Sequence, residues 1–303
     1  MLRAALLMFC ASPQTAARES CCEWCCPPLR IVADRMPTTL VTGATSGLGL
    51  AAAHHLAAKG HHVLVHGRTP AKVDAVVHAI AAKGGHADGY VADLSSMSDV
   101  RKLGDNVAKG HPSLDGLLNN AGSFDGDYTG ERVVTAEGNE YTLAVNVLAP
   151  FLLTALLLPS LRASGRARVV ISSSVSMGAA DALGDLQLRR GYSAHRAYSL
   201  SKLCDAMLVA ELHARYGGEA VAFNTMDPTS QVGLGADTKM LRAGWGSWGG
   251  SCDEATISSE MMADEAWAGR SGEGFATRKE VADSLLRRRL WDECVRLTGA
   301  IYE

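Results

Sequence analysis

A tyrosine and a lysine stand four residues apart in the stretch YSLSK, residues 198–202. If this stretch is helical, positions i and i+4 share one face, so the Lys202 ammonium lies near the Tyr198 phenol. A nearby positive charge stabilises a phenolate and lowers the pKa of a tyrosine, which is about 10 in free peptides. The pair is therefore a candidate for proton transfer at neutral pH. Such a spacing also arises by chance, so its weight depends on the residues that accompany it.

Two further polar positions lie upstream of this pair. Ser172, Ser173 and Ser174 end an apolar run that reads as a strand, and a hydroxyl there could hydrogen-bond a substrate carbonyl. Asn146 lies inside a long apolar stretch, where a buried amide needs a hydrogen-bond partner. In the alternative interpretation, that partner is simply backbone within the fold.

A glycine-rich turn follows the first apolar run of the chain. Residues 42–49 read TGATSGLG and lead directly into the helical pattern LAAA. Glycines at this spacing allow positive φ, close approach of backbone to a pyrophosphate, and a helix whose first N–H groups face that anion. A glycine-rich loop without a ligand is the alternative, but a strand-to-helix junction is the context that dinucleotide binding requires. The residues expected to contact the cofactor here are Gly43, Thr45, Ser46, Gly47, Leu48 and Gly49.

The end of the second predicted strand indicates which dinucleotide is bound. An acidic residue there would accept hydrogen bonds from a ribose 2′-hydroxyl, but the strand ends VHGRT and supplies Arg68 instead. Because a guanidinium suits a 2′-phosphate, the sequence predicts NADP (as NADPH) over NAD. The alternative for Arg68 is a solvated surface charge.

Two more strand ends match the same ligand. Asp93 follows the third predicted strand and could accept a hydrogen bond from the adenine amino group, although an aspartate there is equally a turn former or helix cap. The fourth predicted strand closes with the motif NNAG, where small side chains leave room for a ribose. The residues predicted to contact the cofactor at this end are Asn120, Ala121 and Gly122.

These residues need a scaffold that brings strand ends together. From Thr38 onward, short apolar runs alternate with longer helical patterns. The predicted strands are Thr38–Val41, His62–Val65, Tyr90–Ala92, Leu117–Leu118, Arg168–Ile171 and Ala220–Phe223, and the predicted helices are Leu48–Lys59, Ala71–Lys83, Asp99–Lys109, Asn139–Arg162 and His195–Tyr216. This alternation is typical of an α/β protein with a mostly parallel, doubly wound sheet. We expect one Rossmann domain over residues 36–303, with a helix over 281–298 packed on its body.

One predicted helix is apolar enough to raise a second interpretation. Tyr141–Leu161 is 21 residues long and carries no charge, which is within the range that spans a bilayer. Asn146 and Pro150 interrupt its apolarity, and it lies between two strands of the predicted sheet. We therefore expect a buried core helix and no transmembrane span.

Composition limits the classes of partner. With 29 Lys and Arg against 32 Asp and Glu, the formal charge of −3 lacks the basic excess typical of nucleic-acid binding, so we expect a small-molecule substrate and no nucleic acid. Five of the eight cysteines lie in the first 26 residues, which is no disulfide framework and favours a reducing compartment. Zinc ligation by that cluster lacks a second ligand pair nearby, so we predict no metal site and a solvated or lipidated tail.

The first 35 residues fall outside the fold pattern. We expect an unstructured leader, or an extension upstream of a true start at Met36. Their short apolar run resembles a weak targeting signal, but acidic residues follow it. The cytoplasm is the expected compartment, and organelle targeting by residues 1–35 is the alternative.

In order and spacing, these motifs resemble the short-chain dehydrogenase/reductase family, and specifically its retinol-dehydrogenase and WW-domain-oxidoreductase-like branch. The resemblance extends from about Thr38 to the C-terminus. The stretches that carry it are TGATSGLG (42–49), NNAG (119–122), VNVL (145–148), RVVISSS (168–174) and YSLSK (198–202).

The resemblance implies hydride transfer between the nicotinamide and a carbonyl or alcohol carbon. Tyr198 would be the general acid or base, and Lys202 would lower its pKa and hold the nicotinamide ribose. Ser174, with Ser173 as the fallback, would steady the developing alkoxide. Asn146 would support a water that links Lys202 to solvent. A homodimer or tetramer is expected through the helices that contain Asn146 and Tyr198.

The chain also departs from the family pattern. After the sixth strand the family has Pro-Gly and, soon after, a threonine that touches the nicotinamide, whereas here Asp227-Pro228-Thr229 is followed by about five extra residues before Thr238. This leaves two hypotheses for the function. The first is an NADP-preferring oxidoreductase acting on a lipophilic carbonyl or alcohol. The second is a nucleotide-binding regulatory or scaffold protein that has lost turnover.

Overall fold

A computed structural model of the protein describes residues 35–124, 131–232, 235–246 and 249–303. The chain divides into residues 1–35 and 36–303, and the sheet and its helices belong to the second part. The predictions for the cysteine cluster and the targeting signal concern residues that lie outside this description.

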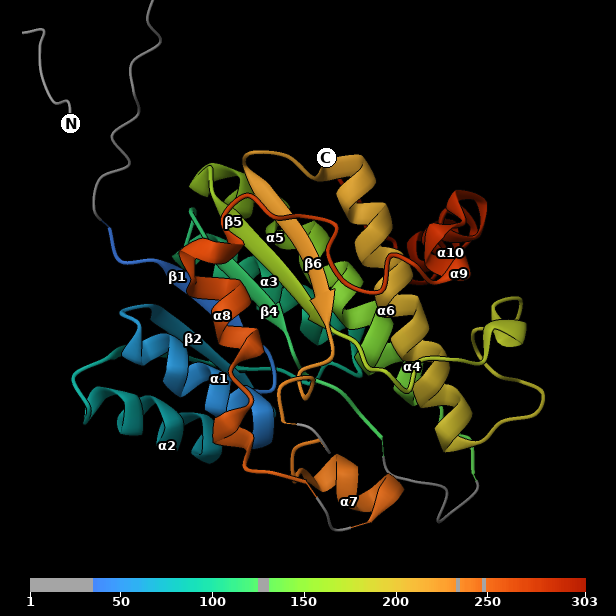
Figure 1. Ribbon diagram of the computed structural model, residues 1–303, viewed down its shortest axis with the longest axis horizontal. Helices are drawn as coiled ribbons and strands as arrows, with labels where there is room; N and C mark the ends of the chain where they lie inside the picture. The colour runs from blue at the N-terminus through green and yellow to red at the C-terminus, as the bar shows by residue number, and fades with distance from the viewer. Residues whose placement is uncertain (1–34, 125–130, 233–234, 247–248) are drawn as a thin grey trace, which may run out of the picture. The chain divides into compact units, whose positions relative to one another are not determined.

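Six parallel strands form one sheet in the order β3-β2-β1-β4-β5-β6 (Figure 1). Their bounds are β1 Thr38–Val41, β2 His62–Gly67, β3 His86–Val91, β4 Gly116–Asn119, β5 Ala167–Ser172 and β6 Val221–Met226. The order reverses between β1 and β4, and a doubly wound sheet binds its ligand at the carboxyl ends of the strands at such a point. The predicted α/β fold is confirmed.

Helices cover both faces of the sheet (Figure 1). One face carries α1 (Gly47–Ala58), α2 (Pro70–Ala81) and α8 (Ile257–Ala263), and the other carries α3 (Met97–Gly110), α5 (Ala149–Ser164) and α6 (Ala194–Tyr216). Neighbouring strand residues point to opposite faces. Leu40 and Leu117 accordingly join the core under α3, α5 and α6, whereas Val41 and Leu118 join the core under α1 and α2.

The long apolar stretch is the central helix of one layer. It consists of α4 (Tyr141–Leu143), a π-helical turn η1 (Ala144–Leu148) and α5. Over Tyr141–Ser164 it is long and apolar enough to cross a membrane by length and composition, but 89% of its most apolar window is buried inside the protein. The predicted buried helix is confirmed. The π-helical turn carries Asn146, and such turns occur frequently at functional sites.

The remaining elements lie in the second half of the chain, around this core. They are η2 (Ala180–Ala182), α7 (Lys239–Trp245), η3 (Cys252–Glu254), η4 (Glu265–Trp267), α9 (Lys279–Ala282) and α10 (Ser284–Thr298). The helix predicted over 281–298 is therefore interrupted. Asp283 has extended backbone and caps α10 by accepting hydrogen bonds from the N–H groups of Leu285 and Leu286. As predicted, α10 packs on the body, against α6.

Candidate active site

Hydrogen bonds from Thr42 join the glycine turn to the NNAG motif. The Thr42 hydroxyl oxygen accepts from the backbone N–H groups of Asn120 and Ala121, each at 3.0 Å. The Asn120 side chain donates in return to the Thr42 carbonyl at 3.1 Å. Thr42 and Asn120 are 78 residues apart in sequence. These hydrogen bonds therefore fix the carboxyl ends of β1 and β4 to each other.

Two glycines of the turn have no room for a side chain. Gly43 has a φ of +67°, and a Cβ there would lie 3.0 Å from the Ala121 Cα. A Cβ at Gly49 would lie 2.3 Å from the Gly43 carbonyl oxygen and 2.4 Å from the Asn120 Nδ2. The side chain of Ser46 does not cap α1, so the first N–H groups of this helix are left for an anionic ligand. This cradle fits the pyrophosphate of a dinucleotide.

His66, which the sequence analysis missed, supports the same turn. Its Nδ1 lies 3.3 Å from the Gly43 nitrogen and its Nε2 lies 3.2 Å from the Ala92 oxygen. Because a backbone N–H only donates and a carbonyl only accepts, the ring is neutral with its proton on Nε2. Burial agrees with this, since it lowers the pKa of His66 to about 4.

The two side chains predicted to bind the adenosine half both line the cavity. Arg68 is exposed and donates from its guanidinium to the Tyr141 hydroxyl at 3.1 Å. The Asp93 carboxylate accepts from the Ser95 N–H and hydroxyl, each at 2.9 Å. Asp93 is therefore a turn former, as the alternative interpretation held, and its position on the cavity wall also suits contact with an adenine.

Tyr198 and Lys202 share one face of α6, and the Lys202 Nζ lies 5.8 Å from the centre of the tyrosine ring. The ammonium donates to the Ser172 carbonyl at 2.7 Å and to the Asp205 carboxylate at 3.0 Å. Both side chains are buried, and both line the cavity that contains the glycine turn. The structure thus brings together the two motifs on which the sequence argument depends.

The pKa of Tyr198 is raised in the structure, whereas the sequence analysis expects Lys202 to lower it. Burial raises this pKa, while the charge of Lys202 and a hydrogen bond with Ser174 lower it. Asp227 and Asp205 add negative charge and raise the pKa further, and the net direction is upward. Without a bound ligand, the increase in the Tyr198 pKa caused by burial is therefore larger than the decrease caused by the charge of Lys202.

The three serines have different roles. The Ser172 carbonyl holds Lys202, and the buried Ser173 hydroxyl donates to the Lys202 backbone oxygen at 2.7 Å. Ser174 is half-buried and hydrogen-bonded to Tyr198. The Ser173 hydroxyl is thus engaged with α6, whereas the Ser174 hydroxyl lies beside Tyr198 and accepts from the Ser176 N–H at 3.1 Å.

Asn146 connects the NNAG loop to α6. Its carbonyl oxygen accepts from the Ser123 N–H at 2.7 Å, and its amide donates to the Ser123 carbonyl at 3.2 Å and to the Ser201 hydroxyl at 3.0 Å. The side chain is thus used for internal hydrogen bonds, including the backbone contact of the alternative interpretation. Its expected role in a water relay stays a prediction.

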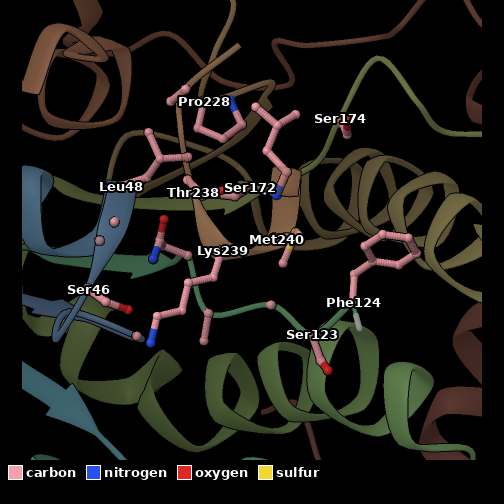
Figure 2. Close-up of a pocket in the computed structure, with 18 of the residues that line it drawn as sticks. Ser46, Leu48, Ser123, Phe124, Ser172, Ser174, Pro228, Thr238, Lys239 and Met240 are labelled. Carbon is pink, nitrogen blue, oxygen red and sulfur yellow. Dashed lines mark hydrogen bonds between the residues drawn. The ribbon is translucent and has the colours of Figure 1, made fainter. Parts of the chain in front are cut away.

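The glycine turn, residues 120–122, the three serines, Tyr198 and Lys202 line one cavity of about 930 Å³, and Asn146 lies behind its lining residues. Figure 2 places Ser46 and Leu48 at one end of it and Ser174 and Phe124 at the other. The Phe124 ring packs 5.1 Å from the Tyr198 ring and 4.9 Å from the His195 ring, measured between centres. The far end therefore has an apolar wall directly beside the tyrosine.

The loop after β6 contributes residues that the sequence analysis left aside. The Asp227 carboxylate accepts from the backbone N–H groups of Val175 and Thr229, each at 2.8 Å. Thr238 caps α7 by accepting from the Leu241 N–H. Thr229, Thr238 and Lys239 all line the cavity. The extra residues thus lead into a short helix beside the cavity, and its first residue, Lys239, places an ammonium there.

Comparisons with known proteins agree with this geometry. A family model described as short chain dehydrogenase matches residues 37–240. A polyprenol dehydrogenase of Mus musculus is 36% identical over 299 residues, covering 86% of this chain and 83% of that protein. Retinol dehydrogenase 14 of Mus musculus is 30% identical over 84% of each chain. A short chain dehydrogenase from Shigella flexneri, solved in complex with NADP, superposes with a TM-score of 0.61 at 25% identity, over 78% of this chain and 94% of that one.

Proposed function

Because this chain belongs to the short-chain dehydrogenase family and is therefore a NAD(P)-dependent oxidoreductase, we propose that it prefers NADP and acts on a lipophilic alcohol or carbonyl. The single observation that carries this proposal is the arrangement of Tyr198, Lys202 and Ser174 in the cavity that also contains the glycine turn. A bound nicotinamide would supply the hydride donor or acceptor.

The chain offers a complete set of contacts for the cofactor. The glycine turn and the start of α1 would hold the pyrophosphate, and Asn120, Ala121 and Gly122 would lie along a ribose. Arg68 supplies a cation where a 2′-phosphate would lie, and no acidic side chain follows it at the end of β2. These features support NADP as the preferred cofactor, with NAD as the less favoured one.

The proton chemistry belongs to the chain itself. In reduction, the Tyr198 hydroxyl donates its proton to the substrate oxygen, and in oxidation the phenolate accepts a proton from the alcohol. Ser174 donates a hydrogen bond to the same oxygen, which stabilises negative charge developing there. The Lys202 ammonium stabilises the phenolate and would present an N–H to the ribose of a bound cofactor.

An apolar cavity end favours a lipophilic substrate. Phe124, Met240 and Leu241 line this cavity, and Val175 beside Ser174 is 72% exposed. An apolar ligand that covered this exposed valine would remove its side chain from water, which favours binding. The names of two relatives, a polyprenol dehydrogenase and a retinol dehydrogenase, agree with long isoprenoid alcohols as the substrate class.

Turnover of isoprenoid alcohols and aldehydes with NADP and NADPH tests the proposal. We expect wild-type activity, and a loss of about 100-fold or more in kcat for Tyr198→Phe, because the phenyl ring fills the same space but carries no proton. Tyr216→Phe, at the far end of the same helix, is the matched control and should keep wild-type kcat. Tight NADPH binding without turnover of any carbonyl or alcohol would instead support the regulatory or scaffold hypothesis.

A further inference from the structure

A buried carboxylate lies behind the catalytic pair and has no role in the proposed chemistry. Asp205 follows Lys202 by three residues on α6, and its oxygen lies 3.0 Å from the Lys202 Nζ. The two side chains are only 1% and 6% exposed. Burial of a charge is costly unless the charge is paired, and among the described residues the charge that offsets the burial of Asp205 comes from Lys202.

Two other titratable groups act on the same lysine. Tyr198 lies on α6 itself, and Asp227 lies at the end of β6. The Asp227 carboxylate is already engaged by the backbone N–H groups of Val175 and Thr229. The thiols of Cys204 on α6 and Cys294 on α10 also face Asp205, and burial raises the pKa of both, which keeps them neutral. Asp205 is thus the carboxylate in direct contact with the ammonium.

We propose that Asp205 is a positioning residue for the reaction: it is the counterion that keeps Lys202 protonated and holds its ammonium against the Ser172 carbonyl. This inference rests on the proposed function. An ammonium has three N–H groups. Two of them are used by Ser172 and Asp205, and the third is left for the cavity and the ribose that would bind there.

Loss of the Asp205 carboxylate should lower the pKa of Lys202. Desolvation lowers the pKa of Lys202, and Asp205 is the first of the charges that raise it again. Without that charge, the fully buried lysine releases its proton more easily. A neutral amine no longer stabilises the Tyr198 phenolate. The direct repulsion of the phenolate by Asp205, which raises the pKa of Tyr198, is lost as well, but it is a smaller effect than the attraction to Lys202, so the tyrosine ionises at a higher pH.

A pair of variants separates charge from shape. Asp205→Asn keeps the size and an acceptor oxygen but removes the charge, and Asp205→Glu keeps the charge but adds a methylene. We expect kcat for alcohol oxidation at neutral pH to fall by about tenfold or more in D205N and by about threefold or less in D205E. These effects are smaller than the roughly 100- to 10,000-fold of a general acid or base, because Asp205 acts through Lys202. A purely structural residue would give the reverse order, and that order overturns the proposal.

The pH profile supplies a second readout. The pH at which kcat for oxidation reaches half its maximum should rise by about one unit or more in D205N, because the phenolate has lost its cation. The matched control is Glu211→Gln, which removes another buried carboxylate from α6 that pairs with Arg215 and Arg287 away from the cavity. It should lower thermal stability and leave the profile unchanged. An unchanged or downward-shifted profile in D205N overturns the proposal.

A measurement without substrate distinguishes failure of this inference from failure of the proposed function. Ultraviolet difference titration of tyrosine, with Tyr198→Phe subtracted, reports ionisation of Tyr198 in the full chain. The midpoint should lie at higher pH in D205N than in the wild type, whether or not a substrate is found. Absence of turnover by the wild type argues against the proposed function alone, whereas equal midpoints argue against the role of Asp205.

Discussion

The proposed preference for NADP rests on Arg68. Its guanidinium is exposed at the cavity edge, with the Tyr141 hydroxyl as its partner, so it can turn toward a 2′-phosphate at little cost. Hydrogen bonds between charged groups contribute roughly 1.5–3 kcal/mol, which corresponds to about ten- to a hundredfold in affinity. This range sets the size of the effect expected on removing the guanidinium.

We therefore predict that Arg68→Asp weakens NADPH binding by about tenfold or more and changes NADH binding little, because an aspartate can accept from a ribose 2′-hydroxyl. Fluorescence titration with each cofactor measures both constants. Lys72→Asp makes the same charge change on an exposed residue of α2 that does not line the cavity, and both affinities should stay near wild type. Equal losses for both cofactors in R68D would show that Arg68 does not read the phosphate.

At the scale of elements, the ends of β1 and β2 are held together by neutral histidines. His66 bridges the glycine turn and the end of β3, and His61, directly before β2, contacts the hydroxyl of Thr39 in β1. Burial lowers the pKa of each to about 4, from 6.5 for a free histidine. Protonation of either histidine should therefore destabilise the strands that lead into the glycine turn.

This depression predicts loss of stability in acid. Below pH 6.5 the unfolded chain binds protons at these two positions and the folded chain does not, so unfolding becomes more favourable as pH falls. The contribution is fully present above about pH 6.5 and is lost progressively down to about pH 4. Urea denaturation at several pH values measures it. His66→Asn should flatten the dependence, and replacement of the exposed His78 should leave it unchanged.

The elements differ in how far local sequence predicts them. Strands β1, β4 and β5 are buried and read as apolar runs, so the sequence analysis located them within one or two residues. Strand β3 begins at His86, four residues before the predicted Tyr90, because it is an exposed edge strand without an apolar run. The break at Asp283 was missed for another reason, since the apolar spacing continues on both sides of it.

The residues of the candidate site also differ in how far local sequence predicts them. The glycine turn and the pair Tyr198 and Lys202 are local motifs, and local spacing is enough to find them. His66 and Asp227 depend on contacts between strand ends far apart in sequence, which spacing does not reveal. Asp205 lies between these cases: its distance of three residues from Lys202 was readable on a helix, but its burial was not.

At the scale of the whole molecule, the two helices expected to form a subunit interface are covered by the chain itself. The exposed residues of α5 are Pro159, Arg162 and Ala163, and those of α6 are His213, Ala214 and Arg215. Figure 1 shows α10 lying against α6. An interface of standard size needs about 800 Å² from each partner, and we expect the few exposed residues of these two helices to supply less than that.

Aromatic side chains pack α10 and the C-terminal residues against α5 and α6. Trp291 of α10 packs 4.8 Å from Phe151 of α5, and Tyr302 stacks 5.4 Å from Tyr216 of α6, measured between ring centres. The Tyr302 hydroxyl donates to the Phe151 carbonyl at 2.6 Å, and the Arg215 guanidinium lies 4.5 Å from the centre of the Trp291 ring. Part of the surface of α5 and α6 is thus packed against α10 and the C-terminal residues.

We therefore expect a monomer of about the 31.9 kDa chain mass in size-exclusion chromatography with light scattering, in place of the dimer or tetramer that the family resemblance implies. Trp291→Ala should cost about 3–5 kcal/mol of unfolding free energy, because it removes a buried aromatic side chain, and should expose apolar surface on α5 and α6. Self-association that appears in W291A but not in the wild type would show that α10 occupies the pairing surface. A stable wild-type dimer whose contacts cross-link through α5 and α6 would contradict this prediction.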